Sequence, residues 1–156
     1  MKIVSSYGRD IDDKIMSQVL YMSTDAYAAY DALNADDGIF VVGAIPSITL
    51  KQFKRRFSST LMILALEKSK LVGMACVTKH KKNLMYLHTV YVKPLKRRAG
   101  IGKRLVKKAL DFAKKSKSSL MLDVNPLNSI AIDMYKSVGF KTCKEQTIKM
   151  EVHYSD

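Results

Sequence analysis

The sequence predicts one mixed α/β domain, with a mostly antiparallel central sheet of about six to seven strands flanked by helices. Three apolar runs of strand length follow one another between residues 61 and 92, separated by short polar turns. A strongly amphipathic helix and another short apolar run come next, which is the order of a strand–helix–strand crossover. The chain has 156 residues, 47% hydrophobic and 26% charged, as expected of a single globular domain.

The first sixty residues predict one strand followed by helices. Residues 1–5 have the composition of a strand, and Asp10 is expected to cap a helix whose apolar residues recur every three or four positions. A second helical stretch is expected at about residues 24–33. Thr49 and Gln52 then form the pattern of a capping box, which predicts the start of a short helix.

The middle of the chain predicts a hairpin and a third strand. Residues 61–67 and 71–78 are apolar runs joined by a polar turn, and residues 84–92 follow a second turn. Regular alternation along the third strand would divide its side chains between two faces. One face would hold Leu84, Tyr86, His88, Val90 and Val92, and the other Met85, Leu87, Thr89 and Tyr91.

The last third of the chain predicts a helix, a strand, a second helix and two strands. The first helix begins near Ile101 and has an apolar stripe opposite a row of lysines. A short buried strand is expected at residues 120–124, and Asn128 is placed to cap the next helix. Residues 140–143 and 146–154 have the composition of two final strands.

Positive charge is concentrated in the second half of the chain. Residues 1–78 carry 9 Lys and Arg against 8 Asp and Glu, whereas residues 79–156 carry 18 against 6. Such a field attracts polyanions, which include nucleic acids, acidic membranes and phosphorylated cofactors. Charge alone does not distinguish these partners from an ordinary solvated surface.

The loop after the third strand predicts a phosphate site. Backbone N–H groups at the start of the following helix have no partner in the helix, and the helix dipole favours an anion there. Gly100 and Gly102 would let the backbone approach a ligand closely. The loop lacks the Gly-Lys-Ser/Thr of a P-loop and the full glycine set of a dinucleotide fingerprint. A basic turn that only opens a helix is the alternative at this point.

Two motifs carry a resemblance to a known family. The first resembles the Arg/Gln-x-x-Gly-x-Gly/Ala loop that binds coenzyme A in the GNAT acyltransferase superfamily, and it reads Arg97-Arg98-Ala99-Gly100-Ile101-Gly102. The second resembles the next conserved segment of that superfamily, and it reads Leu122-x-Val124-x-x-x-Asn128-x-x-Ala131-x-x-x-Tyr135-x-x-x-Gly139-Phe140. Both occur in the family's order, and the resemblance covers about residues 61–140.

The resemblance implies a single domain over residues 1–156 with the GNAT acyl-CoA N-acyltransferase fold. Residues 1–60 would supply helices on the acceptor side, residues 61–140 the acetyl-CoA-binding core, and residues 141–156 the final strands. Acetyl-CoA would be the cosubstrate, with no metal. Its pantetheine arm would occupy a gap where the strands at 84–92 and 120–124 splay apart. The cofactor-binding residues implied are Val90, Tyr91, Val92, Arg97, Arg98, Ala99, Gly100, Ile101, Gly102, Lys103, Asn128, Ala131 and Tyr135.

Two residues are candidates for proton transfer. The resemblance implies that Tyr135 protonates or hydrogen-bonds the departing thiolate, although a tyrosine packed in the core is the alternative. Many relatives carry a glutamate base where this chain has His88. A histidine can accept the proton that an alkylammonium must lose before attack. A histidine packed on the sheet, with a base elsewhere or none, is equally compatible with the sequence.

The predicted activity is N-acetyl transfer to a primary amine by direct attack in a ternary complex. The acceptor would be a small molecule or a protein, and the seven aspartates within residues 10–37 suggest a cationic one, unless they are ordinary surface. A catalytically inactive acetyl-CoA sensor is the alternative function. Nucleic acid and membranes are not expected partners, and the protein would be a monomer or homodimer. The start of the sequence resembles no signal peptide, and Cys76 and Cys143 suit buried free thiols, so a cytoplasmic location is expected.

Overall fold

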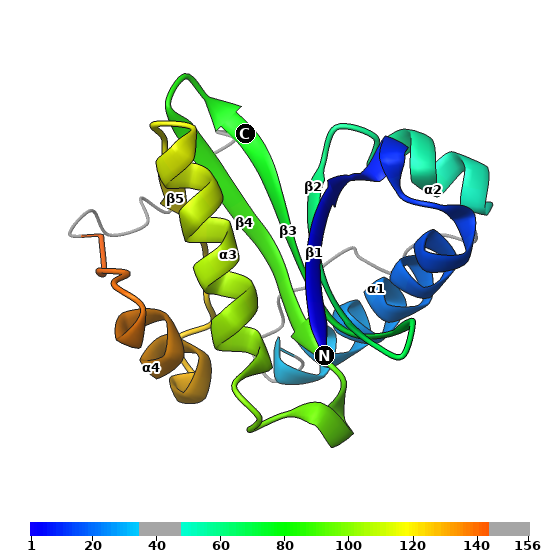
Figure 1. Ribbon diagram of the computed structural model, residues 1–156. Helices are drawn as coiled ribbons and strands as arrows, with labels where there is room; N and C mark the ends of the chain where they lie inside the picture. The colour runs from blue at the N-terminus through cyan, green and yellow to red at the C-terminus, as the bar shows by residue number, and fades with distance from the viewer. Residues whose placement is uncertain (35–47, 144–156) are drawn as a thin grey trace, which may run out of the picture.

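The computed structural model describes residues 1–34 and 48–143, and it confirms the predicted mixed α/β architecture (Figure 1). Its five strands form one sheet in chain order, and the first four are antiparallel while the last pair is parallel. The strands are β1 (Lys2–Tyr7), β2 (Leu61–Glu67), β3 (Lys70–Lys81), β4 (Leu84–Val92) and β5 (Ser119–Met121). Helices α1 (Asp13–Asn34) and α2 (Leu50–Arg56) cover one face, and α3 (Ile101–Lys115) and α4 (Ser129–Ser137) lie on the other.

Helix α1 begins later than the sequence predicted. Residues Gly8–Asp10 form the short 3₁₀ helix η1 instead of the first turn of α1. The carboxylate of Asp12 accepts a hydrogen bond from the N–H of Ile15 at 3.0 Å, so Asp12 is the cap and the prediction for Asp10 was wrong. The reason is local packing: a Cβ on Gly8 would lie 2.2 Å from the carbonyl oxygen of Phe57, and this close approach fixes the turn ahead of the helix.

Helix α1 is also continuous, whereas two helical stretches were predicted. The sequence breaks its apolar pattern at Ser23 and Thr24. Their hydroxyls donate to the carbonyl oxygens four residues earlier, at 2.8 Å and 3.3 Å, and so the polar pair is accommodated within the helix.

Helix α2 begins as predicted. The N–H of Gln52 donates to the Thr49 hydroxyl at 3.2 Å, and the Gln52 side chain accepts from the Thr49 N–H at 2.8 Å. This reciprocal pair confirms the capping box. The helix buries Phe53 against the sheet, where it forms part of the core with α1.

A β-bulge in β4 overturns the predicted division of its side chains. Thr89 pairs with Cys76, but the next residue of β3, Val77, pairs with Leu87, so His88 is an extra residue. Leu87 and Val90 therefore both pack against the α3 side of the sheet. The prediction that Val90 and Val92 share a face with His88 was wrong, because an inserted residue reverses the alternation beyond it.

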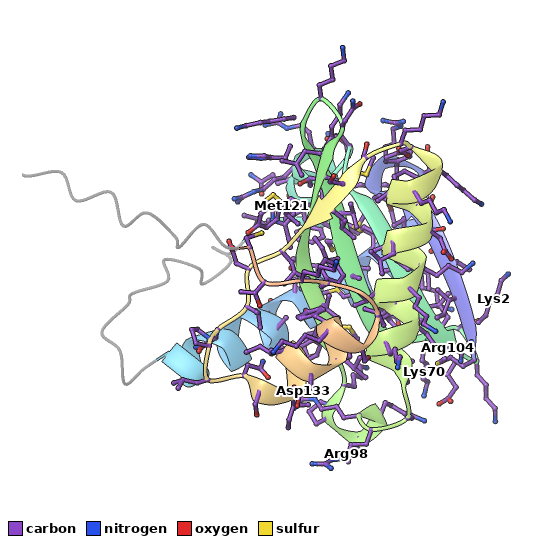
Figure 2. All side chains as sticks on the ribbon, turned by 90° about the vertical axis from the view of Figure 1, so that its left-hand side faces the viewer. Lys2, Lys70, Arg98, Arg104, Met121 and Asp133 are labelled. Carbon is purple, nitrogen blue, oxygen red and sulfur yellow. The ribbon has the colours of Figure 1, made fainter. Side chains whose placement is uncertain are left out.

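The C-terminal elements are shorter than predicted. Strand β5 ends at Met121, where a strand over residues 120–124 was expected (Figure 2). Residues 140–143 form no strand, and Phe140 instead packs its ring on Tyr135 at a centroid distance of 5.7 Å. The predicted strand at 146–154 lies outside the described residues. Cys143 is exposed, contrary to expectation, while Cys76 is a buried free thiol.

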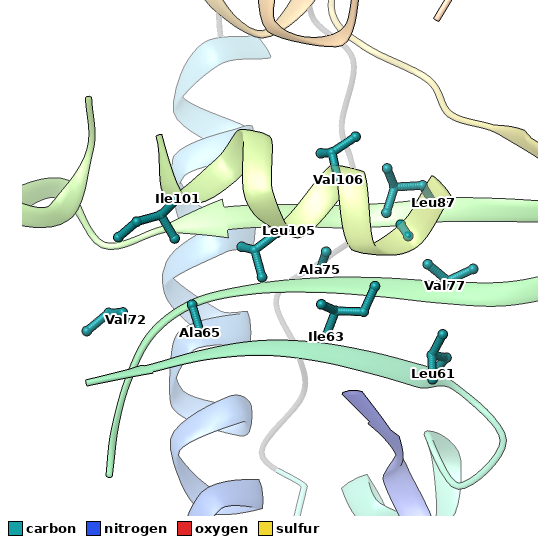
Figure 3. Packing of buried hydrophobic residues seen from close by; sticks show 11 residues of the cluster. Leu61, Ile63, Ala65, Val72, Ala75, Val77, Leu87, Ile101, Leu105 and Val106 are labelled. Carbon is teal, nitrogen blue, oxygen red and sulfur yellow. The ribbon is translucent and has the colours of Figure 1, made fainter. Parts of the chain in front are cut away.

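Two hydrophobic clusters hold the sheet between its helices. Figure 3 shows the cluster beneath α3, in which Ile101, Leu105 and Val106 pack on apolar side chains of β2 and β3. The second cluster joins α1 and α2 to the opposite face. A sheet buried on both faces is a rigid support for the loops and strand ends that carry the site. Within the described residues, no helix has both the length and the hydropathy to cross a membrane.

Candidate active site

Strand β4 has an open edge beside its second half. The parallel ladder joins Leu84–Tyr86 to Ser119–Met121 and ends there, and no other described strand pairs with β4 on that side. The hydroxyl of Tyr86 donates to the carboxylate of Asp123, which ties the two segments together where they begin to diverge. Backbone groups between His88 and Val92 on this edge are therefore available to an extended ligand. The sequence analysis expected such an edge where β4 and the segment after it splay apart.

The loop between β4 and α3 presents a run of unpaired amides. The short 3₁₀ helix η3 (Pro94–Lys96) follows β4, and α3 begins at Ile101 with Gly100 as its cap. Arg98 and Gly100 have φ angles of 62° and 72°, and this left-handed backbone turns the loop toward the helix. The N–H groups of residues 98–103 donate to no acceptor in the described structure, and the helical ladder starts only with Arg104. Unpaired N–H groups at a helix start favour the approach of an anion, as the sequence predicted for this loop.

The glycines of this loop leave space in front of the amides. A Cβ on Gly100 would meet nothing within 4 Å, and one on Gly102 would meet only a methyl of Val92 at 3.8 Å. The positive φ explains the glycine at 100, whereas no contact with a described residue demands one at 102.

Basic side chains around the loop divide into two groups. Lys96 pairs with Glu67, and this hydrogen bond together with the charge of Lys96 lowers the pKa of the Glu67 carboxyl. Arg97 donates from Nε to the carbonyl oxygen of Val92 at 3.1 Å and lies over the Tyr91 ring. These two residues hold the loop against the sheet. The others, Arg98, Lys103 and Arg104, make no ion pair with any described residue. Figure 2 shows Arg98 on the loop and Arg104 on α3.

Helix α4 presents the second predicted motif. The Asn128 side chain accepts from the N–H of Ala131 at 3.1 Å, so its capping role is confirmed, and its contact with a ligand stays a prediction. Tyr135 is half-buried against the α3 side of the core. Burial raises the pKa of its phenol, and its hydroxyl has no hydrogen-bond partner among the described residues. Tyr135 is thus a neutral donor with its proton uncommitted.

His88 lies on the other side of the sheet from Tyr135. The bulge lets two consecutive residues, His88 and Thr89, line the same pocket, which a regular strand would forbid. The Nε2 atom of His88 hydrogen-bonds to the hydroxyl of Thr78 on β3. Burial lowers the pKa of His88, and the charge of His80 lowers it further, so the ring is neutral at physiological pH.

A pocket of about 100 Å³ lies beside His88, between α1, α2 and the sheet. Its apolar lining comes from Phe53, Phe57, Met62 and Cys76. Its polar lining is a set of hydroxyls with His88, namely Ser23, Thr60, Thr78 and Thr89. Burial raises the pKa of the Cys76 thiol to about 12, so it is an inert part of the wall. The sequence did not predict this pocket, because Ser23 is followed by Thr24 and Asp25 and Thr60 follows two serines, so neither residue stands out from its neighbours.

The two candidate proton-transfer residues make no contact with each other. Tyr135 packs in the cluster beneath α3, while His88 lines a pocket whose wall belongs to the cluster beneath α1 and α2. The two residues therefore lie on opposite faces of the sheet, and in the described structure β4 has no strand neighbour beyond Tyr86 on its outer edge.

The acidic stretch predicted to attract a cationic acceptor is partly engaged elsewhere. The carboxylate of Asp10, in η1, lies 3.7 Å from Nε of Arg9. Asp12 caps α1, and Asp13 pairs with Lys54 at 2.7 Å. Asp25 has no described ion-pair partner. The side chains of Asp31, Asp36 and Asp37 lie outside the described part of the chain. The acidic rim therefore stays a prediction.

Comparison with known sequences identifies relatives over the same part of the chain. The model of the acetyltransferase (GNAT) family matches residues 26–140. The thialysine N-epsilon-acetyltransferase of Bos taurus is 40% identical over 62 residues, which are 39% of this chain and 36% of that protein. The N-alpha-acetyltransferase RimI of Mycobacterium tuberculosis is 35% identical over 74 residues, 46% of each chain. An uncharacterised protein of Mycobacterium leprae is 40% identical over 74 residues, 46% of this chain. The chain thus matches 20% to 46% of the length of these three relatives.

Solved structures share the whole fold at low identity. A probable acetyltransferase has a TM-score of 0.73 with 18% identity, covering 100% of both chains. The PaiA N-acetyltransferase of Thermoplasma acidophilum, solved with coenzyme A, has a TM-score of 0.67 with 21% identity over 94% of each chain. These likenesses establish the fold, and the family model covers well over half of the sequence. The chain belongs to the acetyltransferase (GNAT) family.

Proposed function

We propose that the chain is an acetyl-CoA-dependent N-acetyltransferase that acts on a primary amine by direct attack within a ternary complex. The observation that carries the proposal is the run of six unpaired amides at residues 98–103, placed beside the open edge of β4. The N-acetyltransferase names of two relatives support the reaction, and a neighbour of the same fold was solved with coenzyme A.

The loop before α3 would hold the diphosphate of the donor. Its amides point outward at the positive end of the helix dipole, and Arg98, Lys103 and Arg104 add charge that no described acid neutralises. The backbone of Val90–Val92 lies on the open edge and would pair with the pantetheine arm as an added strand. Asn128 and Ala131, at the start of α4, would contact the arm from across the gap.

His88 would remove the proton from the acceptor. A primary amine has a pKa near about 10 and is protonated at neutral pH, so a base must free its lone pair before attack. The lowered pKa keeps His88 unprotonated, and the bond to Thr78 fixes its ring. With Nε2 donating its hydrogen to Thr78, Nδ1 carries the free lone pair that accepts the proton.

Tyr135 would supply a proton to the sulfur that leaves the acetyl group. Its raised pKa keeps the phenol protonated, and its hydroxyl has no competing partner in the described structure. The base, His88, and the acid, Tyr135, then lie on opposite sides of the sheet. Each would transfer its own proton, one from the amine and one to the sulfur, and no proton would have to pass between them.

Two measurements test this proposal. Calorimetry should show one acetyl-CoA site per chain, and a panel of primary amines should give thiol release that depends on the protein. Absence of binding would contradict the donor site. Binding without turnover on any amine would favour the alternative of an acetyl-CoA sensor and would leave His88 and Tyr135 without a catalytic role.

A further inference from the structure

The pocket beside His88 contains a buried hydroxyl that has no hydrogen-bond partner among the described residues. Thr60 is 5% exposed and lines the pocket, and its side chain makes no hydrogen bond to any described residue. Its neighbour in the pocket, Ser23, is 7% exposed but donates to the carbonyl oxygen of Val19. Buried hydroxyls are nearly always paired, because an unpaired one destabilises the folded chain. A small polar group that enters the pocket would supply a partner that no described residue provides.

The backbone holds Thr60 in a fixed position. Its N–H donates to the carbonyl oxygen of Phe57 at 3.0 Å, and its own carbonyl oxygen accepts from the N–H of Gly8 at 3.0 Å. The residue thus joins the end of α2 to the start of the sheet, and it directly precedes β2. A hydroxyl on so constrained a backbone is suited to recognition, since little ordering is lost when it binds.

The pocket offers no counter-charge. None of the side chains that line it in the described structure is an acid, a lysine or an arginine, and the remaining walls are apolar or hydroxyl-bearing. A second ammonium or a carboxylate bound there would lose its hydration without gaining an ion pair. A pocket of about 100 Å³ has room for a small group, since one water needs about 10–15 Å³ of such volume.

We infer that this pocket binds a short, uncharged, hydrogen-bonding group of the acceptor, and that Thr60 selects that group. The inference rests on the proposed function and narrows its acceptor to amines that carry a neutral hydroxyl, amide or carbonyl within a few bonds of the nitrogen. The pocket then disfavours diamines and amino acids in which the second group is charged. His88, which lines the same pocket, meets the amine while Thr60 meets the neutral group.

Four amines of nearly equal size test the inference. They are 3-aminopropan-1-ol, butylamine, 1,3-diaminopropane and β-alanine, with ethanolamine and 4-aminobutan-1-ol to vary the spacing. Wild-type kcat/KM should be highest for an amino alcohol. In Thr60→Val, the ratio of kcat/KM for the best amino alcohol to that for butylamine should fall about tenfold, because the hydroxyl is lost while the shape is kept. Thr60→Ser should restore the ratio, and Ser59→Ala, at the exposed neighbouring position, should not change it.

Thermal unfolding of the unliganded protein gives a second readout. Thr60→Val should melt at the wild-type temperature or above it, since it removes an unpaired hydroxyl. A lower melting temperature would show that the hydroxyl has a structural partner and would overturn the inference. The inference would also be overturned if Thr60→Val lowered kcat/KM equally for all the amines, or if the wild-type protein preferred the diamine.

Binding separates this inference from the proposed function. If no amine is acetylated, ligand-observed NMR in the presence of coenzyme A still compares 3-aminopropan-1-ol with 1,3-diaminopropane on wild type and Thr60→Val. Selective binding of the amino alcohol that Thr60→Val abolishes would support the pocket although the proposed reaction had failed. Equal or absent binding of both amines would overturn the inference. If amines are acetylated and their relative kcat/KM values are the same in wild type and Thr60→Val, the proposed reaction is retained and the role of Thr60 is refuted.

Discussion

The imidazole of His88 on β4 hydrogen-bonds to the hydroxyl of Thr78 on β3, on the face of the sheet covered by α1 and α2. The Tyr86 ring lies beside it, with centroids 4.8 Å apart. This arrangement depends on the bulge, which places His88 and Thr89 side by side in one pocket. The bulge thus sets a neutral imidazole next to the end of β4 whose edge is open.

The pKa of His88 predicts where activity is lost in acid. Because burial lowers this pKa, the acid limb of the kcat profile should fall below about pH 6.5, the ordinary value for histidine. His88→Ala should reduce kcat by about 10²-fold near neutral pH, where His88 is unprotonated in wild type while free amine is still scarce, and the loss should shrink in acid, where His88 is protonated. Steady-state rates between pH 5 and 9 measure both effects. A loss of equal size at every pH would assign His88 a positional role only.

The same pKa shift predicts a change in stability. The unfolded chain takes up a proton on His88 near pH 6.5, while the folded chain does so only at lower pH. The free energy of unfolding is therefore highest above about pH 6.5, and part of it is lost as the pH falls through the lowered pKa that His88 has in the folded chain. In His88→Gln this loss should be smaller than in wild type, as measured by urea unfolding at pH 7.5 and 5. If the free energy of unfolding fell by the same amount between pH 7.5 and 5 in both proteins, His88 would be as well hydrated in the folded chain as in the unfolded one.

Tyr135 should be required for turnover and not for donor binding. Tyr135→Phe removes the hydroxyl and keeps the ring that packs on Phe140, so the fold and the affinity for acetyl-CoA should be unchanged. We expect kcat to fall about 10²-fold, the usual range for a general acid. Tyr21→Phe is the matched control, since Tyr21 is 69% exposed on α1. A wild-type rate for Tyr135→Phe would remove the residue from the mechanism.

Local sequence signals predicted the parts of the site that depend on local structure. The Gly100 loop, the Asn128 cap and the Thr49 capping box are each set by a few adjacent residues, and all three appear where the sequence placed them. The bulge at His88 depends instead on register between β3 and β4. The pocket around Thr60 depends on how α2 packs against the sheet. Neither relationship leaves a periodic mark in the sequence, so alternation alone gave the wrong face for Val90.

The position of the α1 cap gives a test of the corrected fold. Asp12→Ala removes the acceptor of the Ile15 N–H and should lower the free energy of unfolding by about 1 kcal/mol. Asp10→Ala removes only an exposed pair with Arg9 and should cost less than about 0.5 kcal/mol. Urea denaturation at pH 7 measures both. The reverse order would restore Asp10 as the cap and shift the start of α1.

Donor affinity should depend on the space and charge in front of Gly100. Gly100→Asp places a carboxylate before the unpaired amides of residues 98–103, where a diphosphate would lie. Aspartate tolerates the left-handed backbone at φ 72° better than most residues, so the fold should be retained. We expect the Kd for acetyl-CoA to rise at least about tenfold by calorimetry. Ser59→Asp adds the same charge at an exposed position ahead of β2 and should leave the Kd unchanged. Unaltered affinity in Gly100→Asp, with far-UV circular dichroism like that of wild type, would place the diphosphate elsewhere, and equal losses in both variants would trace the effect to net charge.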